Sequence, residues 1–140
     1  MTDAEAIRDL LGRWVFLYDE GRLEAIDECF TEDAVFTMRQ GDETIAGPVE
    51  GRQALTSFLH SFDRSLKRRH MLTNSWFESL EESSAVVIST VLIVQLDGSR
   101  AVPATTGYYR DEVVKTDRWR IRSRTGHYDN PPPSRRDAED

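Results

Sequence analysis

Apolar residues recur at helical spacing near the N-terminus of the chain and again in its middle. Thr2 and Glu5 have the spacing of a capping box, which predicts that a helix begins there. Gly21 is expected to end this helix. The same period predicts a short second helix over residues 23–30 and a third over residues 52–62. The apolar stripe of the first helix follows the i, i+3, i+4, i+7 rule and consists of Ile7, Leu10, Leu11, Trp14, Val15 and Tyr18.

Beyond the third predicted helix the apolar pattern changes to the alternation that is typical of β-strands. Asp97 and Gly98 predict a hairpin turn within this part of the chain. A short strand is also predicted earlier, over residues 34–38, after a turn at 31–33, and residues 41–51 are expected to form a loop or a hairpin connection. Helices that precede an antiparallel sheet indicate an α+β domain, with the helices over one face of the sheet and a pocket between the layers. The later strands are predicted over residues 68–78, 85–96, 100–114 and 118–128.

The strand predicted over residues 85–96 is apolar on both of its faces. One face can pack on the helices, but the second also needs cover. We predict that this second face is buried in a homodimer, formed through the sheet. The alternative is an irregular central strand that the chain's own loops cover. The two faces carry Val87, Val91 and Ile93, and Val86, Ile88, Leu92 and Val94, respectively.

The chain has 140 residues, which predicts one domain over residues 1–130 and a flexible tail over 131–140. A formal net charge of -7 argues against a nucleic-acid partner, and the basic run at 67–69 is interpreted as a solvated strand edge. No apolar run is long enough to span a membrane. Cys29 is the only cysteine, so no disulfide can form within the chain. The polar N-terminus does not resemble a signal peptide, which predicts a cytoplasmic protein.

His70 lies in the segment RRHMLTNSWF, which is predicted to be a strand. Strand alternation places it on one face with Leu72, Asn74 and Trp76. A titratable ring on an inward and mostly apolar face must either find a hydrogen-bond partner or take part in chemistry. The structural alternative is a buried histidine that binds a partner and does nothing further.

A family resemblance rests on the order of several motifs: a long helix that ends in LYDEG, then FTEDAVF, a glycine-containing loop, HMLTN, GYYRDE and WRIRSR. In this order the chain resembles the SnoaL-like proteins of the nuclear transport factor 2-like fold, over about residues 5–128. The resemblance implies a cone-shaped α+β barrel in which three N-terminal helices pack on a curved, mostly antiparallel sheet. Its members include scytalone dehydratase, hexachlorocyclohexane dehydrochlorinase, ketosteroid isomerase, polyketide cyclases and noncatalytic dioxygenase subunits, so fold alone does not decide function.

The dehydratase and the dehydrochlorinase use a histidine early in a strand and an aspartate near the end of the first helix. The matching positions here are His70 and Asp19, and Tyr18 matches a tyrosine that precedes the aspartate in the dehydratase. The resemblance therefore implies His70 as a general base, oriented by Asp19, with Tyr18 as donor to a developing oxyanion. On helical spacing alone, Asp19 is a solvated carboxylate at the helix end and Tyr18 fits a core tyrosine equally well.

This sequence also departs from both enzymes. No histidine occurs at residues 103–106, where the dehydratase has its second one, although Thr105 or Thr106 could supply a hydroxyl. Trp14 stands where the dehydrochlorinase has a basic residue. An arginine of its last strand matches Arg122 or Arg124, and sequence does not say which of the two points inward.

We therefore predict lyase or isomerase chemistry of the acid–base type, namely dehydration, elimination or a proton shift, on a small hydrophobic molecule of aromatic or polyketide-like character. The alternative is a noncatalytic module that binds a small ligand or serves in assembly. No cofactor and no metal site are predicted, because neither a glycine-rich phosphate loop nor a ligand cluster of fixed spacing is present. Besides the catalytic set, the pocket is predicted to include Trp14, Phe58, Phe62, Met71, Asn74, Trp76, Thr106 and Arg124.

Overall fold

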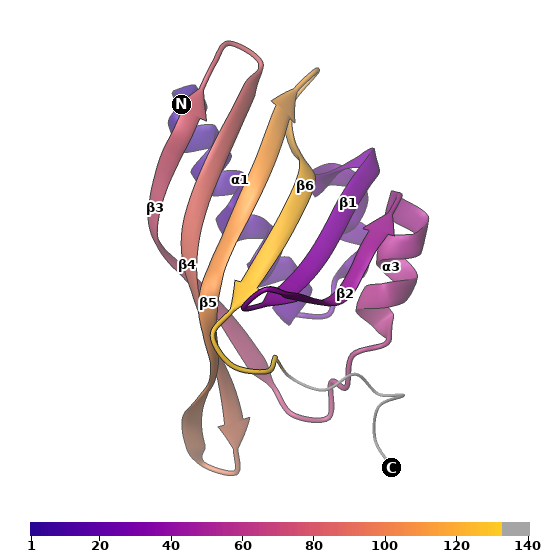
Figure 1. The fold of residues 1–140 in the computed structure, drawn as a ribbon, viewed down its shortest axis with the longest axis vertical. Helices are drawn as coiled ribbons and strands as arrows, with labels where there is room; N and C mark the ends of the chain where they lie inside the picture. Colours follow the sequence, from indigo (N-terminus) through magenta and orange to yellow (C-terminus); the bar gives the residue numbers. More distant parts are fainter. Residues whose placement is uncertain (133–140) are drawn as a thin grey trace.

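The structure, a computed structural model, describes residues 1–132 and consists of a helical layer against one curved sheet (Figure 1). The capping box predicted at Thr2 is confirmed: the Glu5 backbone N–H donates to Thr2 Oγ1 at 3.2 Å, and the Thr2 N–H donates to Glu5 Oε2 at 2.7 Å. The first helix ends at Asp19, two residues before Gly21, whose φ of 81° suits glycine. The helical segments are α1 (Asp3–Asp19), the 3₁₀ turn η1 (Leu23–Ala25), α2 (Ile26–Cys29) and α3 (Arg52–His60).

The sheet has six strands in the order β2-β1-β6-β5-β4-β3 and is not closed into a barrel. Neighbouring strands are antiparallel except for β1 and β6, which run parallel. Helix α1 crosses behind the sheet and packs mainly on β3, while α3 covers β1 and β2 (Figure 1). The predicted α+β architecture is thus confirmed. The strands are β1 (Phe30–Gln40), β2 (Glu43–Glu50), β3 (Arg68–Leu80), β4 (Ser84–Asp97), β5 (Arg100–Lys115) and β6 (Trp119–Tyr128).

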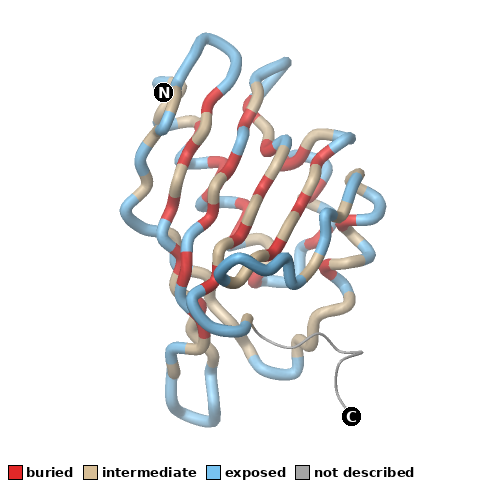
Figure 2. Tube along the Cα trace, in the orientation of Figure 1, coloured by how far each residue is buried: buried red, intermediate tan, exposed pale blue. Residues whose placement is uncertain are grey.

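The hydrophobic core lies between the helices and the concave face of the sheet, where buried positions alternate with less buried ones along β1, β4, β5 and β6 (Figure 2). The apolar stripe of α1 supplies much of it, because five of its six predicted members are buried. Tyr18, the sixth, is partly buried and faces the site described below. The core residues of the α1 stripe are Ile7, Leu10, Leu11, Trp14 and Val15.

Two predictions near the second helix need correction. The predicted helix at 23–30 is divided into η1 and α2, and Phe30 already begins a strand. Residues 31–33 belong to that strand rather than to a turn, although the pairing there is irregular. Phe30 pairs with Ile121 and Val35 with Ser123, so a step of five positions along β1 matches a step of only two along β6. Residues 41–51 form the hairpin alternative, with β2 as its second strand.

Strand β3 contains a bulge that changes which side chains point inward. Between Thr73 and Trp76 it has one residue more than β4, and Asn74 has a φ of 53°. His70 and Leu72 lie on the inward side, but beyond the bulge the inward residues are odd-numbered, as Phe77 shows. The prediction that Asn74 and Trp76 share the His70 face is therefore wrong, and both are exposed.

The outer face of β4 is covered only in part. Its four apolar side chains, those of Val86, Ile88, Leu92 and Val94, are half-buried, while the helix-facing side is buried at every apolar position from Ala85 to Ile93. Large exposed side chains lie nearby on β3 and β5, namely Met71, Trp76 and Tyr108. The homodimer through this face stays a prediction.

The C-terminal segment after β6 turns back along β5. The Asp129 N–H donates to the Thr106 carbonyl at 2.9 Å, and Thr105 Oγ1 donates to the Pro131 carbonyl at 3.4 Å. Of the tail predicted over 131–140, residues 133–140 lie outside the described residues. No helix within residues 1–132 has both the length and the hydropathy to cross a membrane.

Candidate active site

The first candidate pair, His70 and Asp19, joins the end of α1 to the start of β3. Asp19 Oδ2 accepts the backbone N–H of His70 at 2.7 Å, and Asp19 Oδ1 lies 2.7 Å from His70 Nδ1. The two side chains are only 3% and 13% exposed, respectively. Asp19 is the last residue of α1, so its side chain reaches the strand where the helix ends. The solvated-carboxylate interpretation of Asp19 is therefore wrong.

This geometry determines the tautomer of the His70 ring. A carboxylate only accepts hydrogen bonds, so Nδ1 must carry the proton that faces Asp19. Nε2 is then the basic nitrogen, and it has no hydrogen-bond partner among residues 1–132. The ring lines two adjoining cavities, so Nε2 is available to a bound molecule. The arrangement is that of a general base with an orienting carboxylate.

Tyr18 stands beside this ring. The two rings meet edge to face, with centroids 5.5 Å apart, and Trp14 packs on the other side at 5.9 Å. Burial raises the pKa of Tyr18 to about 12, although the nearby Arg64 guanidinium acts in the opposite direction, so the phenol remains a donor at ordinary pH. Its hydroxyl has no hydrogen-bond partner among residues 1–132, where no buried side-chain N or O is unpaired. The hydroxyl is therefore in contact with the cavity.

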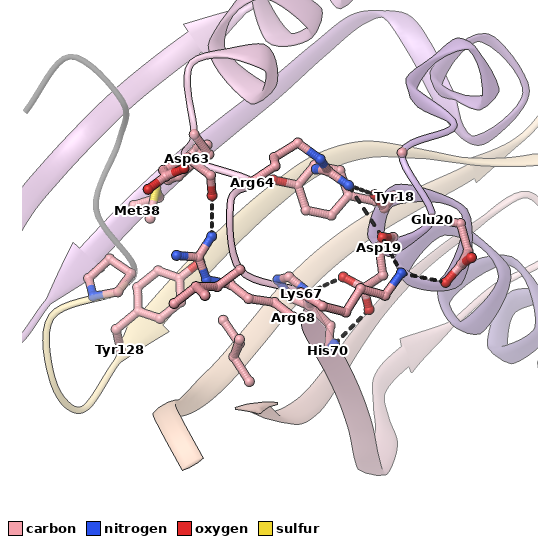
Figure 3. A pocket seen from close by; sticks show the side chains of 15 residues that line it. Tyr18, Asp19, Glu20, Met38, Asp63, Arg64, Lys67, Arg68, His70 and Tyr128 are labelled. Carbon is pink, nitrogen blue, oxygen red and sulfur yellow. Dashed lines mark hydrogen bonds and ion pairs between the residues drawn. The ribbon is translucent and has the colours of Figure 1, made fainter. Parts of the chain in front are cut away.

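The two cavities share His70 in their linings, and Figure 3 shows the outer one. The outer one has a volume of about 270 Å³ and opens between the end of α1, the segment after α3 and the start of β3. The inner one, of about 60 Å³, extends between α1 and the sheet among aromatic and aliphatic side chains. A molecule that enters from outside passes the ring of His70 before it reaches the core. The residues that line both cavities are Tyr18, Phe62, His70 and Tyr128.

A buried ion pair closes the inner end. Arg124 Nε and Nη2 donate to the two carboxylate oxygens of Asp111 at 2.7 and 3.0 Å, and the two residues are 4% and 0% exposed. The guanidinium lies 4.1 Å from the ring centroid of Tyr109. Burial alone would lower the pKa of Arg124, but the Asp111 carboxylate outweighs this effect, so the net direction is upward. Arg124 therefore remains a cation at the wall of the inner cavity.

Strand parity on β6 is set by a second bulge. Arg122 is the extra residue between Ile121 and Ser123, opposite Val113 and Glu112 of β5, and its side chain is exposed. Arg124 is consequently the inward arginine. Sequence reasoning missed Asp111, although the alternation of its strand places it on an inward face, where an unpaired carboxylate is costly.

The rings of Tyr109 and Tyr128 pack edge to face beside this pair, with centroids 6.3 Å apart. Burial raises the pKa of each phenol. Both phenols line the inner cavity, and both therefore stay protonated. Neither tyrosine was predicted as a site residue, although the alternation of β5 shows Tyr109 as inward.

The other predicted pocket residues divide into three groups. Trp14 and Phe62 line the cavities, as expected. Phe58 is not part of either lining but packs on the Phe62 ring, with centroids 5.2 Å apart. The prediction for Thr106 is wrong, because its exposed side chain donates to Asp129 outside the cavity, and Thr105 is the buried, inward residue.

Three predicted wall residues of β3 lie on the outside of the sheet. Met71, Asn74 and Trp76 are exposed and line neither cavity, the last two because of the bulge. Met71 alternates with the inward neighbours His70 and Leu72, so simple strand parity already places it outside.

Cations line the mouth of the outer cavity, and two of them, Lys67 and Arg68, belong to the basic run at 67–69 that was predicted to be a solvated strand edge. Arg64 Nη2 donates to the Tyr18 carbonyl at 2.6 Å and to the Asp19 carbonyl at 3.3 Å. Lys67 Nζ donates to the Asp19 carbonyl at 3.1 Å. Arg68 donates from Nε to Gln95 Oε1 at 3.0 Å. Among residues 1–132, no group of three or more His, Cys, Asp or Glu side chains could hold a metal ion.

The fold and the cavity define a cone-shaped protein of the nuclear transport factor 2-like, cystatin-like class. Within this class, the sequence matches the SnoaL-like domain over residues 1–125, and the chain belongs to that family. A search of curated proteins found no significant match.

Solved structures show the same fold in proteins of different kinds. One is a nuclear transport factor 2-like protein with a cystatin-like fold from Novosphingobium aromaticivorans. It is 22% identical, the match covers 93% of this chain and 84% of that chain, and the TM-score is 0.78. Another is the beta subunit of benzoate 1,2-dioxygenase from Burkholderia mallei, with 20% identity, 91% of each chain and a TM-score of 0.76. A third is a scytalone dehydratase-like protein from Novosphingobium aromaticivorans, with 22% identity and a TM-score of 0.72. The match covers 94% of this chain and 90% of that chain. At these identities the likeness shows the fold alone.

Proposed function

We propose that this protein catalyses a cofactor-independent lyase or isomerase reaction of the acid–base type on a small hydrophobic molecule, aromatic or polyketide-like. The observation that carries the proposal is the contact of Asp19 with both the backbone N–H and Nδ1 of His70, each at 2.7 Å. It supports a ring with fixed orientation and tautomer, whose basic nitrogen faces a cavity. The family includes dehydratase-like members, which is consistent with this chemistry.

In the proposed reaction, His70 Nε2 removes a proton from a carbon next to a carbonyl or a leaving group. The imidazolium that forms donates from Nδ1 to the Asp19 carboxylate, which stabilises the new positive charge. Tyr18 donates a hydrogen bond to the oxygen on which negative charge develops. Positioned proton transfer of this kind contributes on the order of 100- to 10,000-fold to the rate.

The cavity supports an apolar substrate with one polar end. Its walls near His70 are mainly aromatic, with Trp14, Phe62 and Tyr128, which favours a flat hydrophobic body. The inner end offers the Arg124 guanidinium, two of whose nitrogens bind Asp111, so that Nη1 remains for a substrate oxygen.

The proton has to return through the same residue. Among the residues that line the two cavities, His70 is the single histidine, and position 105 carries a threonine hydroxyl. His70 in its protonated form therefore delivers the proton either to another carbon of the substrate or to the leaving group. This one-base arrangement favours a proton shift or an elimination with a good leaving group.

The experiment begins with a thermal-shift screen of pocket-sized aromatic and polyketide-like compounds, followed by a turnover assay on the compounds that bind. His70→Gln should abolish turnover while the melting temperature stays within a few degrees of wild type. The matched control is His60→Gln on the exposed side of α3, which should leave both turnover and melting temperature unchanged. Full turnover by His70→Gln would end the proposal, and so would unfolding of that variant together with normal activity in Tyr18→Phe and Asp19→Asn.

A second candidate function is a noncatalytic module for binding or assembly. It is favoured by the exposed apolar side chains of the outer sheet face, with Met71 and Trp76 about half exposed. The beta subunit of a dioxygenase is among the structural neighbours. We propose a homodimer through this face. Binding of cavity ligands without turnover of any of them would favour the module over the enzyme.

A further inference from the structure

Within residues 1–132, two guanidinium groups at the mouth of the outer cavity have no carboxylate partner. Neither Arg64 nor Arg68 makes an ion pair among residues 1–132, although both are partly buried and line the cavity. Within residues 1–132, most of the arginines that form ion pairs lie at the surface. Arg124, which pairs with Asp111, is buried instead. Unpaired cations that line a cavity are suited to an anion that comes from outside.

The acceptors that hold these two arginines are all neutral. Arg64 Nη2 donates to the carbonyls of Tyr18 and Asp19, and its guanidinium lies over the Tyr18 ring at 4.9 Å from the centroid. Arg68 donates from Nε to Gln95 Oε1 and from Nη1 to the Asp63 carbonyl. These bonds fix each guanidinium in place, but no carboxylate of the described part of the chain compensates its charge, and several of its N–H donors have no acceptor there.

The carboxylates at the mouth, in contrast, already have donors. Asp19 binds the ring and backbone of His70. Glu20 Oε2 lies 2.7 Å from Lys67 Nζ and 2.7 Å from an Arg69 nitrogen.

Asp63 completes the set of mouth carboxylates. It accepts the N–H of Ser65 at 2.9 Å and the Ser65 hydroxyl at 3.1 Å. Each of these carboxylates therefore already accepts hydrogen bonds from other residues, whereas Arg64 and Arg68 are held by neutral acceptors (Figure 3).

We propose that Arg64 and Arg68 form a subsite for an anionic group, a carboxylate or a phosphate ester, at the outer end of the substrate. The inference rests on the proposed function, because it assumes that the same cavity holds the substrate, and it narrows the substrate class. The ligand is an amphipathic anion whose hydrophobic body points toward His70 and whose charge stays at the mouth. Two guanidinium groups can bind such an anion from two sides, and they thereby determine how deeply the hydrophobic part of the ligand enters the cavity.

The test compares ligands that differ only in charge. A series of aryl alkanoates of increasing chain length is measured against the corresponding uncharged amides by isothermal titration calorimetry. Naphthyl phosphate against naphthol forms a second pair that separates phosphate from carboxylate recognition. Because a hydrogen bond to a charged group contributes about 1.5–3 kcal/mol, we expect at least one anion to bind about tenfold or more tightly than its neutral counterpart.

Arg68→Gln should remove most of this preference, and Arg68→Lys, which keeps the charge, should retain part of it. The control is Arg122→Gln, because Arg122, like Arg68, makes no ion pair within residues 1–132, but it is exposed and lines neither cavity. Arg64→Gln should act in the same direction as Arg68→Gln. Because Arg64 also binds the carbonyls at the end of α1, the melting temperature of the Arg64→Gln variant is recorded in parallel.

Two results would overturn the subsite. One is that no anion of the series binds more tightly than its neutral partner. The other is that Arg122→Gln weakens anion binding as much as Arg68→Gln does. Neither readout requires turnover, so an anion preference in a protein without activity would keep the subsite and end the proposed reaction.

Discussion

Asp19→Asn is the most informative single change in the site, because it removes a charge and keeps the shape of the side chain. The two carboxylate oxygens each accept a hydrogen bond at 2.7 Å, one from the His70 backbone and one from its ring. An asparagine offers one oxygen and one NH₂ group. If the oxygen continues to accept the backbone N–H, the NH₂ group must face Nδ1, which then becomes the acceptor.

The expected cost follows from the burial of the pair. The Asp19 side chain is 3% exposed, and a hydrogen bond to a charged group contributes about 1.5–3 kcal/mol. Because one of the two bonds survives in weakened form, we expect the free energy of unfolding to fall by about 2–3 kcal/mol. The control is Asp9→Asn on the same helix, whose carboxylate is half exposed and 3.5 Å from Arg13. Its effect should stay within about 0.5 kcal/mol.

The assay has two parts. Urea denaturation measures the stability difference, and ¹⁵N chemical shifts of the His70 ring report which nitrogen carries the proton. In wild type the proton belongs on Nδ1, and in Asp19→Asn it should move to Nε2, which removes the basic nitrogen from the cavity. An Asp19→Asn variant that is as stable as Asp9→Asn, with ring shifts like those of wild type, would refute the reasoning.

Three further predictions concern the rest of the molecule. Arg124→Met leaves Asp111 buried without its partner and should lower the free energy of unfolding by about 3–5 kcal/mol. The double variant with Asp111→Asn should regain part of this loss. Additive losses of the two substitutions in urea denaturation would contradict a coupled pair. Burial raises the pKa of Tyr18 from 10.0 to about 12, so the neutral phenol favours the folded state below pH 10, and this stabilisation is lost as the pH rises toward 12. Tyr18→Phe should therefore flatten the alkaline part of a stability curve by up to about 2 kcal/mol, and curves of equal slope would speak against it. Trp76→Glu on the outer face should dissociate the proposed homodimer in sedimentation experiments, and a wild-type chain that is monomeric at every concentration would exclude the dimer.

Local signals were enough to predict the first helix, but not the contact between its last residue and His70. The capping box at Thr2 and the apolar period of the first helix need only neighbouring residues, and both correspond to what the structure contains. The proximity of His70 and Asp19, which are 51 residues apart, came from the family resemblance, because helical spacing alone favoured a solvated Asp19.

What the sequence did not reveal depends on strand register. A single extra residue near Asn74 reverses the parity of β3, so alternation counted from His70 placed Trp76 on the wrong face. A second extra residue at Arg122 decides that Arg124 points inward, opposite Asp111. Such bulges depend on how two strands pair, which a pattern read along one strand does not contain.

The cations at the mouth of the cavity could not be predicted for a different reason. The basic run at 67–69 is a short cluster next to a strand, and such clusters are usually solvated. Its role follows only from tertiary structure, because the segment after α3 brings Arg64 to the end of α1 and places Arg68 beside Asp63.

The central claim is that His70 Nε2 moves a proton of a bound molecule. Solvent exchange tests it most directly: a carbon acid that binds in the cavity is incubated in D₂O with wild type, His70→Gln or His60→Gln, and deuterium uptake is followed by NMR. We predict uptake with wild type and His60→Gln, and a rate at least about 100-fold lower with His70→Gln. Equal rates for wild type and His70→Gln, or no uptake into any ligand that the wild-type cavity binds, would contradict the claim.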